Sequence, residues 1–427
     1  MLVDLTARKI SDKDLTATTD RSAGAYPRAA QLRVLQIGKY YPPYRGGMES
    51  HLEILSRELK GKVDLKVIVS NTNRQTTREL VDDVEVTRVG KLFDVSSAAV
   101  CPGLVGEIRK AKADVVHLHW PNPTAVIAYL ASGHRGKLVF TYHSDIVRQR
   151  KMAAAFMPIL RHALRRAAAI IVSSPNYVEG SDVLREFRDR CRVIPFGVSV
   201  DHFNQFDRRE LWRIRELYGP RIVLGVGRMV YYKGFVFLVR AMTRVNGHLL
   251  IIGKGPLREY LAQLAVDLGI SDRVTLLSEV DDIRPYYHAA DVFALSSVMR
   301  SEAFGIVQLE AMACGKPVVN TQLDSGVPFV SPHGVSGLTV PPADSDALGE
   351  ALEQLLNQAD RKDELGQGGR SRVQDKFTVE RMVQSTFNLY QEVVHGKRVA
   401  GYNDEDLVLA QASGQRSEIR RQRENWP

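Results

Sequence analysis

Cysteine is scarce in this chain of 427 residues, which contains only three. Cys101, Cys191 and Cys314 stand far apart, and none belongs to a Cys-x-x-Cys pair or to a spacing typical of zinc ligands. A disulfide framework and a structural zinc site are therefore poorly supported, and reduced thiols of the kind found in the cytosol are expected.

Long apolar runs are also missing. No stretch approaches the roughly 18 consecutive apolar residues that a membrane-spanning helix needs. Residues 1–20 mix acids and bases and lack the apolar segment of a signal peptide. We therefore expect a soluble or at most peripheral protein, located in the cytoplasm or on the inner face of the plasma membrane.

Acidic residues are outnumbered by basic ones, 49 to 58, which leaves a formal net charge of +9. This balance favours anionic partners such as phosphates, nucleic acid or an acidic membrane face, and a basic solvated surface is the alternative. No recognisable nucleic-acid reader motif is present, so a nucleic-acid partner is not expected. The rest of the composition, with 44% hydrophobic residues, is that of an ordinary globular protein.

Short apolar strands alternate with helical segments along most of the chain. In the first half we expect strands at residues 33–38, 65–69, 115–118, 138–141 and 169–173, and a helix at residues 48–59. The alternation restarts after residue 197, with strands expected at residues 222–226, 248–252, 274–277, 292–295 and 317–320 and helices at residues 235–242, 257–268 and 307–312. This pattern predicts doubly wound parallel sheets.

The predicted fold class is therefore α/β, with two Rossmann-like domains facing across a cleft. The N-terminal domain is expected at residues 32–195 and the C-terminal domain at residues 196–377. The remaining segments are a loose tail, a helix that packs back on the first domain and a polar tail, at residues 1–31, 378–396 and 397–427 respectively. Ligands of such sheets bind beyond the carboxyl ends of the strands, which is where we expect the site.

Loops after three predicted strands carry residues suited to a phosphate. Gly46 and Gly47 let the backbone approach a ligand and leave amides for an anion, although a tight turn without a ligand is the alternative. Arg228 and Lys233 would bring two positive charges to a diphosphate leaving group, unless both merely face solvent. Gly253 lies in a third loop, which lacks the third glycine of a dinucleotide fingerprint, so a nicotinamide enzyme is disfavoured.

A pair of glutamates eight residues apart forms the most informative segment. Glu302 precedes a helix expected to begin around Gly305, and Glu310 lies about two turns along it. At roughly 100° per residue we expect the two carboxylates on related faces. One would reach a transferred sugar and the other ribose hydroxyls, while free amides at the helix start face a phosphate. The alternative is one acid that complements the helix dipole and one solvated acid.

Histidines stand at the ends of two predicted strands. His117 and His119 follow one strand and His143 follows the next. A His-x-His pair can bind a metal, but we expect alternating strand positions to point to opposite faces, and no carboxylate completes a ligand set. The prediction is therefore that no metal site is present. Each histidine is either catalytic or a hydrogen-bonded structural residue.

Residues 146–178 contain no aspartate or glutamate. Basic side chains accumulate there among apolar ones, at Arg148, Arg150, Lys151, Arg161, Arg165 and Arg166. A basic helix with apolar residues suits an anionic membrane surface and, just after His143, a lipid-linked acceptor; a domain helix with an exposed basic side is the alternative. Pro158 interrupts the stretch, so two short helices are one option.

Taken together and in this order, these segments resemble the retaining family 4 glycosyltransferases of the GT-B fold, over roughly residues 33–395. The resemblance implies that the loop at Gly46 and Gly47 closes over a nucleotide-sugar and that Arg228 and Lys233 bind its diphosphate. It also implies a sugar contact near the reacting centre for Glu302.

Further roles follow from the same resemblance. Glu310 would bind ribose, and His143 would lie near the donor sugar. The remaining donor contacts would come from Gly253 and from the amides of Phe304, Gly305 and Ile306. Two positions depart from the family pattern: Ala303 replaces a glycine, and Ser325 stands in place of the first glycine of a pair, which leaves the local sugar contacts open.

The sequences of residues 142–147 and 336–342 resemble those of the family members that act in bacterial polysaccharide assembly, several of which use GDP-mannose. The resemblance thus implies a hexosyltransferase that takes GDP-mannose, or a UDP-hexose, and a saccharide or lipid-linked acceptor, with no metal or other cofactor. The alternatives are a UDP-sugar enzyme with a soluble acceptor and a nucleotide-sugar epimerase that does not hydrolyse its substrate.

Overall fold

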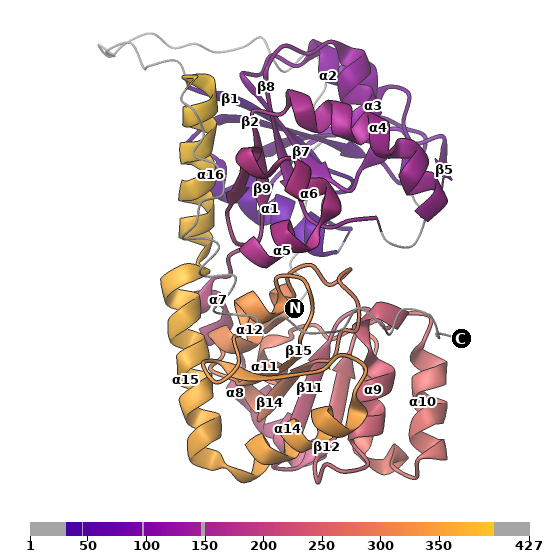
Figure 1. The fold of residues 1–427 in the computed structure, drawn as a ribbon, viewed down its shortest axis with the longest axis vertical. Helices are drawn as coiled ribbons and strands as arrows, with labels where there is room; N and C mark the ends of the chain where they lie inside the picture. Colours follow the sequence, from indigo (N-terminus) through magenta and orange to yellow (C-terminus); the bar gives the residue numbers. More distant parts are fainter. Residues whose placement is uncertain (1–30, 45, 96–97, 147–149, 397–427) are drawn as a thin grey trace. The chain divides into compact units, whose positions relative to one another are not determined.

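The computed structural model describes residues 31–44, 46–95, 98–146 and 150–396, apart from the side chains of residues 150, 151 and 153. Within this part the chain forms two compact units. Unit 1 contains the chain up to Val172, Val183–Ile194 and the helix α16 (Val379–Val394), and unit 2 contains Ser173–Asp182 and Pro195–Thr378 (Figure 1). The predicted tails at residues 1–30 and 397–427 lie outside the described residues.

An eight-stranded sheet forms the centre of unit 1, in the order β10-β9-β8-β7-β1-β2-β4-β3. Its neighbouring strands are parallel except β3, which is antiparallel to β4. The strands are β1 (Arg33–Ile37), β2 (Asp64–Ser70), β3 (Thr77–Val81), β4 (Val84–Val89), β7 (Val115–Trp120), β8 (Lys137–Tyr142), β9 (Ala169–Val172) and β10 (Cys191–Val193). A separate hairpin joins β5 (Phe93–Val95) to β6 (Ala98–Val100).

Helices flank the unit 1 sheet and bury its central strands, of which β7 is buried along its whole length and β8 from its second residue onward. They are α1 (Gly47–Leu59), α2 (Leu104–Lys110), α3 (Pro123–Ser132), α4 (Arg150–Arg166), α6 (Asp182–Glu186), the short 3₁₀ helix η1 (Arg188–Arg190) and α16. α1 and α16 pack against each other, so the end of the described chain completes unit 1 (Figure 1).

Unit 2 holds a six-stranded, fully parallel sheet in the order β13-β12-β11-β14-β15-β16. Counted from β11, this is the order 3-2-1-4-5-6 of a Rossmann sheet. The strands are β11 (Ile222–Val226), β12 (His248–Ile252), β13 (Val274–Leu277), β14 (Val292–Leu295), β15 (Val318–Thr321) and β16 (Gly337–Val340). The order reverses between β11 and β14, which is where such sheets place their ligands.

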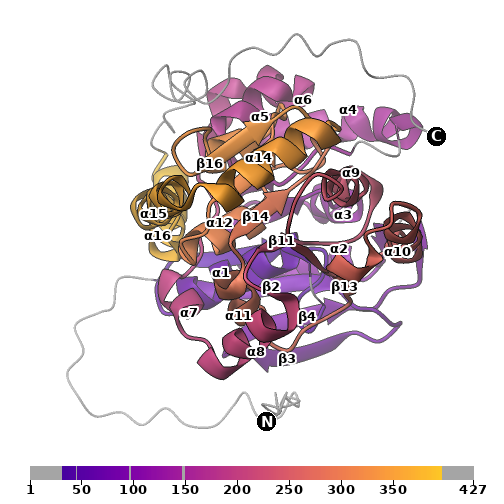
Figure 2. The ribbon, with the colours of Figure 1, turned by 90° about the horizontal axis from the view of Figure 1, so that it is seen from below.

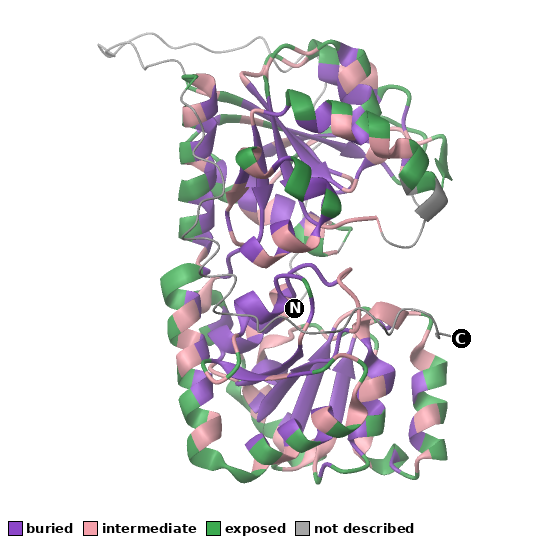
Figure 3. Cartoon of the chain, in the orientation of Figure 1, coloured by how far each residue is buried: buried purple, intermediate pink, exposed green. Residues whose placement is uncertain are grey.

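The helices of unit 2 cover this sheet. They are α5 (Pro175–Gly180), α7 (Val200–Asn204), α8 (Arg208–Tyr218), α9 (Phe235–Ala241), α10 (Arg258–Asp267), α11 (Arg284–Ala289), α12 (Ile306–Ala313), α13 (Val327–Val330), α14 (Ser345–Asn357) and α15 (Ala359–Lys376), with the 3₁₀ helices η2 (Tyr231–Lys233) and η3 (Ser271–Arg273). α14 packs against α9 and crosses the sheet beside β14 and β16 (Figure 2). Figure 3 shows the sheet strands buried and the outer faces of helices such as α15 exposed.

The predicted class, α/β with two doubly wound parallel-sheet domains, is confirmed. Four strands of unit 2 have the predicted bounds. β11, β12 and β14 are buried along most or all of their length and read as apolar runs, whereas β13 is a partly buried edge strand. The segment Ser173–Asp182, which we placed with the first domain, clusters with unit 2. No helix in the described ranges combines the length and apolar character needed to cross a bilayer.

Candidate active site

The charged residues predicted for the site in unit 2, Arg228, Lys233 and Glu302, lie on loops at the switch point of its sheet, where the strand order reverses. β11 runs into a loop that holds Arg228 and leads to η2 and Lys233, and the neighbouring strand β14 runs into a loop that ends at Glu302. Because β11 and β14 are adjacent and parallel, their carboxyl ends open on the same edge. Two segments about 70 residues apart in sequence therefore meet in space.

Lys233 and Glu302 form an ion pair at this edge. The Lys233 Nζ atom lies 2.5 Å from a carboxylate oxygen of Glu302, and each side chain is only 11% exposed. The Ser297 hydroxyl donates a hydrogen bond of 3.0 Å to the same oxygen. Burial lowers the pKa of the Lys233 ammonium, but the charge and hydrogen bond of Glu302, together with Tyr232 and Glu310, raise it, so the net pKa shift is upward and the ammonium stays protonated.

The two glycine loops of unit 2 support Lys233 through close backbone packing. A side chain on Gly253, whose φ is 150°, would place its Cβ 2.1 Å from the carbonyl oxygen of Gly227, so no larger residue fits there. Gly227 in turn lies against the end of the Lys233 side chain. Arg228 is exposed, and the structure gives its guanidinium no ion pair among the described residues. This guanidinium is accessible to an anion.

The start of α12 is built by buried polar contacts. Gly305 caps the helix with a left-handed φ of 74°, and Ile306 is the first helical residue. The Gln308 amide donates to the carbonyl of Phe304 at 3.1 Å and accepts from Asn320 at 2.9 Å. The ring of Phe304 is buried against neighbouring aromatic rings of unit 2. These contacts hold the first amides of α12 at the carboxyl edge of the sheet.

The two positions that depart from the family pattern lie on two loops that contact each other, Ala303 between β14 and α12 and Ser325 between β15 and α13. The amide of Gly326 donates a hydrogen bond of 2.7 Å to the carbonyl of Ala303. A Cβ on Gly326 would lie within 3 Å of Ala303 and of Phe304. The glycine that remains of the usual pair therefore still packs against the residues that precede α12.

Glu310 takes its position from a tyrosine. The Tyr287 hydroxyl, on α11, donates a hydrogen bond of 2.6 Å to the Glu310 carboxylate. Burial raises the pKa of Glu310, while this hydrogen bond and the charge of Lys233 lower it, and the net shift is upward. The helical-face argument that related Glu302 to Glu310 was wrong, because α12 begins at Ile306 and Glu302 lies in the preceding loop.

In unit 1, the predicted glycine loop leads directly into α1. Gly46 is the N-cap of the helix with an extended backbone, and Gly47 is its first residue. Glu49 lies in the first turn and is buried, and a Cβ on Gly46 would lie 2.4 Å from its carboxylate. The carboxylate of Glu49 therefore lies at the first turn of α1, where we expected a bound anion.

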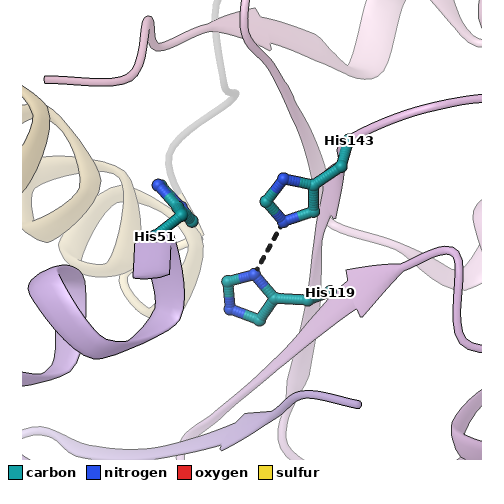
Figure 4. A group of neighbouring side chains, drawn as sticks. All are labelled: His51, His119 and His143. Carbon is teal, nitrogen blue, oxygen red and sulfur yellow. Dashed lines mark hydrogen bonds between the residues drawn. The ribbon is translucent and has the colours of Figure 1, made fainter. Parts of the chain in front are cut away.

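Histidines line the switch point of the unit 1 sheet, between β1 and β7. The rings of His117 and His119 lie 4.5 Å apart, so the expectation that they point to opposite faces was wrong. Residues i and i+2 of a strand share a face. His119 Nδ1 lies 3.1 Å from His143 Nε2, and His119 Nε2 lies 3.3 Å from the amide oxygen of Gln36 (Figure 4). All three rings are buried.

The hydrogen bonds define the proton positions in this cluster. Since the amide oxygen of Gln36 can only accept, His119 carries its proton on Nε2, and its Nδ1 accepts from the Nε2–H of His143. Burial lowers the pKa of both rings well below the ordinary histidine value, so both are neutral. His117 is held separately, by Tyr390 at 2.6 Å and Thr141 at 2.7 Å, and burial lowers its pKa to about 3.

A third histidine, His51 on α1, faces this pair (Figure 4). The ligand atoms of His51, His119 and His143 lie within 4.8 Å of one another. No local sequence pattern indicates this grouping, because His51 belongs to a helix more than 60 residues before His119. The prediction that no metal site is present considered only His117, His119 and His143 with a carboxylate, whereas the structure brings three imidazoles together without any carboxylate.

The basic stretch forms one helix, α4, with Pro158 inside it rather than two short helices. Its second half is anchored by the buried side chains of Leu160 and Leu164. Arg148 and the side chains of Arg150 and Lys151 lie outside the described residues.

The described arginines of α4 differ in their surroundings. Arg161 is paired with Glu186 at 2.5 Å, which offsets its charge. Arg165 and Arg166 are exposed, as are Met152 and Ile159. The exposed surface of this helix thus combines positive charge with apolar side chains.

Comparison with known proteins agrees with this geometry. Residues 220–358 match the family model described as glycosyl transferases group 1, and residues 45–202 match the model of glycosyltransferase family 4. The O-antigen chain mannosyltransferase C of Escherichia coli is 31% identical over 371 residues, covering 86% of this chain and 100% of that protein. The chain belongs to the family 4 glycosyltransferases.

One further relative and one solved structure are informative. A GDP-mannose-dependent alpha-(1-6)-phosphatidylinositol monomannoside mannosyltransferase of Mycobacterium tuberculosis is 29% identical over 364 residues, or 79% of this chain and 92% of that protein. The sucrose-phosphate synthase of Thermosynechococcus elongatus has a TM-score of 0.74 at 23% identity, covering 86% of this chain and 100% of that one. The latter likeness shows the GT-B fold alone.

Several residues that position the glycosyltransferase site were missed in the sequence. Ser297 follows β14, so the rule that sites lie beyond strand ends would have found it. Tyr287 and Gln308 carry no comparable signal, because their partners are set by how α11 and α12 pack.

Proposed function

We propose that this glycosyltransferase transfers a mannosyl residue from GDP-mannose to a saccharide or lipid-linked acceptor during cell-surface polysaccharide assembly, with retention of configuration and without a metal cofactor. The observation that carries the proposal is the ion pair of Lys233 and Glu302 beside the start of α12. The choice of mannose is supported by relatives that are named as mannosyltransferases, one of them GDP-mannose-dependent.

Positive charge at the switch point suits the departure of a nucleoside diphosphate. As the bond between the anomeric carbon and the phosphate oxygen breaks, negative charge develops on that oxygen. Arg228 is exposed to receive the diphosphate. The Lys233 ammonium has three N–H donors, so it can donate to a phosphate oxygen while it keeps its ion pair with Glu302. The amides at the start of α12 add the positive end of the helix dipole.

The carboxylates have separate proposed roles. Glu310, oriented by Tyr287, accepts hydrogen bonds from the ribose hydroxyls of the donor. Glu302 contacts the transferred sugar and fixes Lys233 at the diphosphate. Gly46, Gly47 and Gly253 are proposed to let the backbone approach the donor closely.

The proposed transfer is a single front-face substitution. The acceptor oxygen bonds to the anomeric carbon on the face from which the diphosphate leaves, and the hydroxyl proton passes to the departing phosphate oxygen. GDP and the glycosylated acceptor are the products. His143, whose ring is neutral and oriented by His119, is proposed to hydrogen-bond a hydroxyl of the transferred sugar.

The acceptor is proposed to reach the enzyme at a membrane. Exposed Arg165 and Arg166 share α4 with exposed Met152 and Ile159, and this helix therefore offers the combination of charge and apolar surface that an anionic bilayer attracts. We place the reaction at the cytoplasmic face of that membrane.

A donor panel tests the proposed function directly. The purified chain is melted with GDP-mannose, other GDP-sugars and UDP-sugars, and turnover is then followed with lipid extracts or oligosaccharides as acceptors. A donor that binds the native fold raises the melting temperature. We expect the largest rise and measurable transfer with GDP-mannose, and a product of retained anomeric configuration.

Other outcomes would replace parts of the proposal. Stabilisation and transfer with UDP-hexoses alone would replace the donor. Conversion of the sugar to an isomer without any acceptor would identify an epimerase. Transfer that is abolished by a metal chelator would overturn the expectation that no metal is required.

A further inference from the structure

The histidine cluster of unit 1 joins three separate elements. His51 comes from the first turns of α1, His119 from the end of β7, and His143 from the residue directly after β8 (Figure 4). Their residues are only 6%, 1% and 7% exposed, respectively. The sheet fixes two of these positions, because β7 and β8 are paired in parallel up to Trp120 and Tyr142.

The nitrogen atoms have nearly the spacing of a metal's ligands. In a tetrahedral zinc site with Zn–N bonds of 2.0–2.1 Å, two ligand nitrogens lie about 3.3 Å apart. His119 Nδ1 and His143 Nε2 lie 3.1 Å apart and face each other with one proton between them. His51 offers its ligand atom within 4.8 Å of both, so the three nitrogen atoms need to approach one another to form a three-nitrogen set.

The hydrogen bond on the second ring nitrogen of His119 also favours coordination of a metal ion. Metal-binding histidines usually donate their second N–H to a carbonyl or carboxylate, which fixes the tautomer that presents a lone pair to the ion. The Nε2–H of His119 makes such a bond to the amide oxygen of Gln36, which leaves Nδ1 as the ligand atom. A set of three imidazoles suits zinc and other late first-row ions, and not magnesium or calcium, which prefer oxygen.

We propose that His51, His119 and His143 form a binding site for a divalent late first-row transition-metal ion, with Zn²⁺ as the best fit, and that the bound ion inhibits sugar transfer. On binding, the proton of His143 moves from Nε2 to Nδ1, and the Nε2 lone pair coordinates the ion in place of the hydrogen bond to His119. A water molecule takes the fourth position. The inhibition rests on the proposed function of His143, whereas the site rests only on the geometry of unit 1.

Measurements on the unmodified full chain test the site without any substitution. We expect calorimetric titration with ZnCl₂ in a chelator-free buffer to give one site of micromolar or tighter dissociation constant. Titration with CoCl₂ should give the strong visible absorption of four-coordinate cobalt, and X-ray absorption of the zinc adduct should give three imidazole nitrogens at about 2.0 Å. The proposal would be overturned if no zinc bound below millimolar concentration, or if the bound zinc had no imidazole ligand.

Substitutions then locate the ion. His51→Gln and His119→Gln should each weaken zinc binding at least tenfold, as loss of one ligand does. His162→Gln is the matched control, because His162 is an exposed histidine of the same unit, on α4, and its loss should leave zinc affinity unchanged. Circular dichroism and melting curves verify that each variant folds. Equal zinc affinity in all three variants and the parent would show that the ion binds elsewhere.

Transfer assays test the inhibition separately. Zinc should inhibit the parent at the concentration at which it binds, and His51→Gln should raise the inhibitory concentration at least tenfold. Zinc that binds at the three histidines without slowing transfer would overturn the inhibitory role. If no donor supports transfer at all, the proposed function fails, while the calorimetric and spectroscopic results still decide the site.

Discussion

The Lys233 ammonium and the Glu302 carboxylate lie 2.5 Å apart, on loops that follow two adjacent parallel strands. Each side chain is largely withdrawn from solvent, so neither charge is well solvated without the other. A phosphate near Lys233 therefore meets a cation that is already oriented and kept charged. This relationship gives the first prediction.

Lys233→Ala and Glu302→Ala should each lower the rate of transfer by about 10²–10³-fold, the usual effect of removing one group that stabilises developing charge. The measurement is kcat for the donor that the panel identifies, with melting curves to verify folding. Arg244→Ala is the matched control, because Arg244 forms an exposed ion pair with Asp346 in the same unit. Near-normal turnover in either site variant would remove that residue from the proposed mechanism.

Arg228 should contribute through its charge and its planar donor fork. We expect Arg228→Ala to raise KM for the donor by about ten- to a hundredfold, and Arg228→Lys to recover only part of the loss because lysine cannot bind a phosphate in the bidentate manner. Steady-state kinetics at varied donor concentration measure both effects. Arg240→Ala, an exposed arginine on α9, should leave KM unchanged. Equal KM in the Arg228 and Arg240 variants would refute a donor contact.

Tyr287→Phe should shift the pH dependence of donor binding. The Tyr287 hydroxyl stabilises the ionised Glu310 and so lowers a pKa that burial raises. Without the hydroxyl, less counteracts the upward effect of burial, so the pKa of Glu310 rises further. The ionised form that binds ribose is lost as the pH falls through this pKa. We expect the acidic limb of the kcat/KM profile to move to higher pH in Tyr287→Phe, and an unmoved limb would contradict the role of Glu310.

The exposed arginines of α4 should attract anionic membranes. Neutralising Arg165 and Arg166 to Gln should weaken binding to vesicles with phosphatidylserine by roughly thirtyfold, because each basic residue near such a surface contributes about 1 kcal/mol. The control is the same double change at Arg208 and Arg209, exposed residues of α8 in unit 2, which alters net charge equally. Sedimentation with vesicles is the measurement, and equal binding by both double variants would exclude α4 as the contact.

Tyr390→Phe should destabilise unit 1. It removes the hydrogen bond between Tyr390 and the buried ring of His117, which leaves a buried polar nitrogen without this partner and costs about 1–3 kcal/mol. Ser385→Ala, an exposed change on the same helix, should be nearly neutral. Denaturant unfolding followed by a probe in unit 1 measures the difference, and equal stability of the two variants would contradict a structural role for this bond.

The sheets of this protein are more predictable from sequence than its site. Strands such as β11 and β14 are continuous apolar runs, because a parallel strand covered by helices must be apolar on both faces. β3 escaped prediction because it is a partly exposed edge strand with charged side chains, and β16 because it is short and begins with a glycine.

For the site, the sequence indicates which residues end a strand but not which residues meet. Lys233 and Glu302 both follow strands, so each is a candidate, yet their direct pairing depends on β11 and β14 being neighbours. His51 lies inside an ordinary amphipathic helix, and only the packing of α1 brings it to His119 and His143. Contacts of this kind depend on tertiary packing, which no local pattern encodes.

The return of α16 to unit 1 has a consequence for biosynthesis. Within the described residues, the first strand of unit 1, β1, begins at Arg33, but its last helix is synthesised only after the unit 2 segment Pro195–Thr378. Until α16 has been synthesised, the surface of α1 that packs against it stays uncovered, and His117 lacks its hydrogen bond with Tyr390. Although domains generally fold in order from the N-terminus, unit 2 can finish its core first here, and unit 1 becomes complete only after α16 has followed Pro195–Thr378 out of the ribosome.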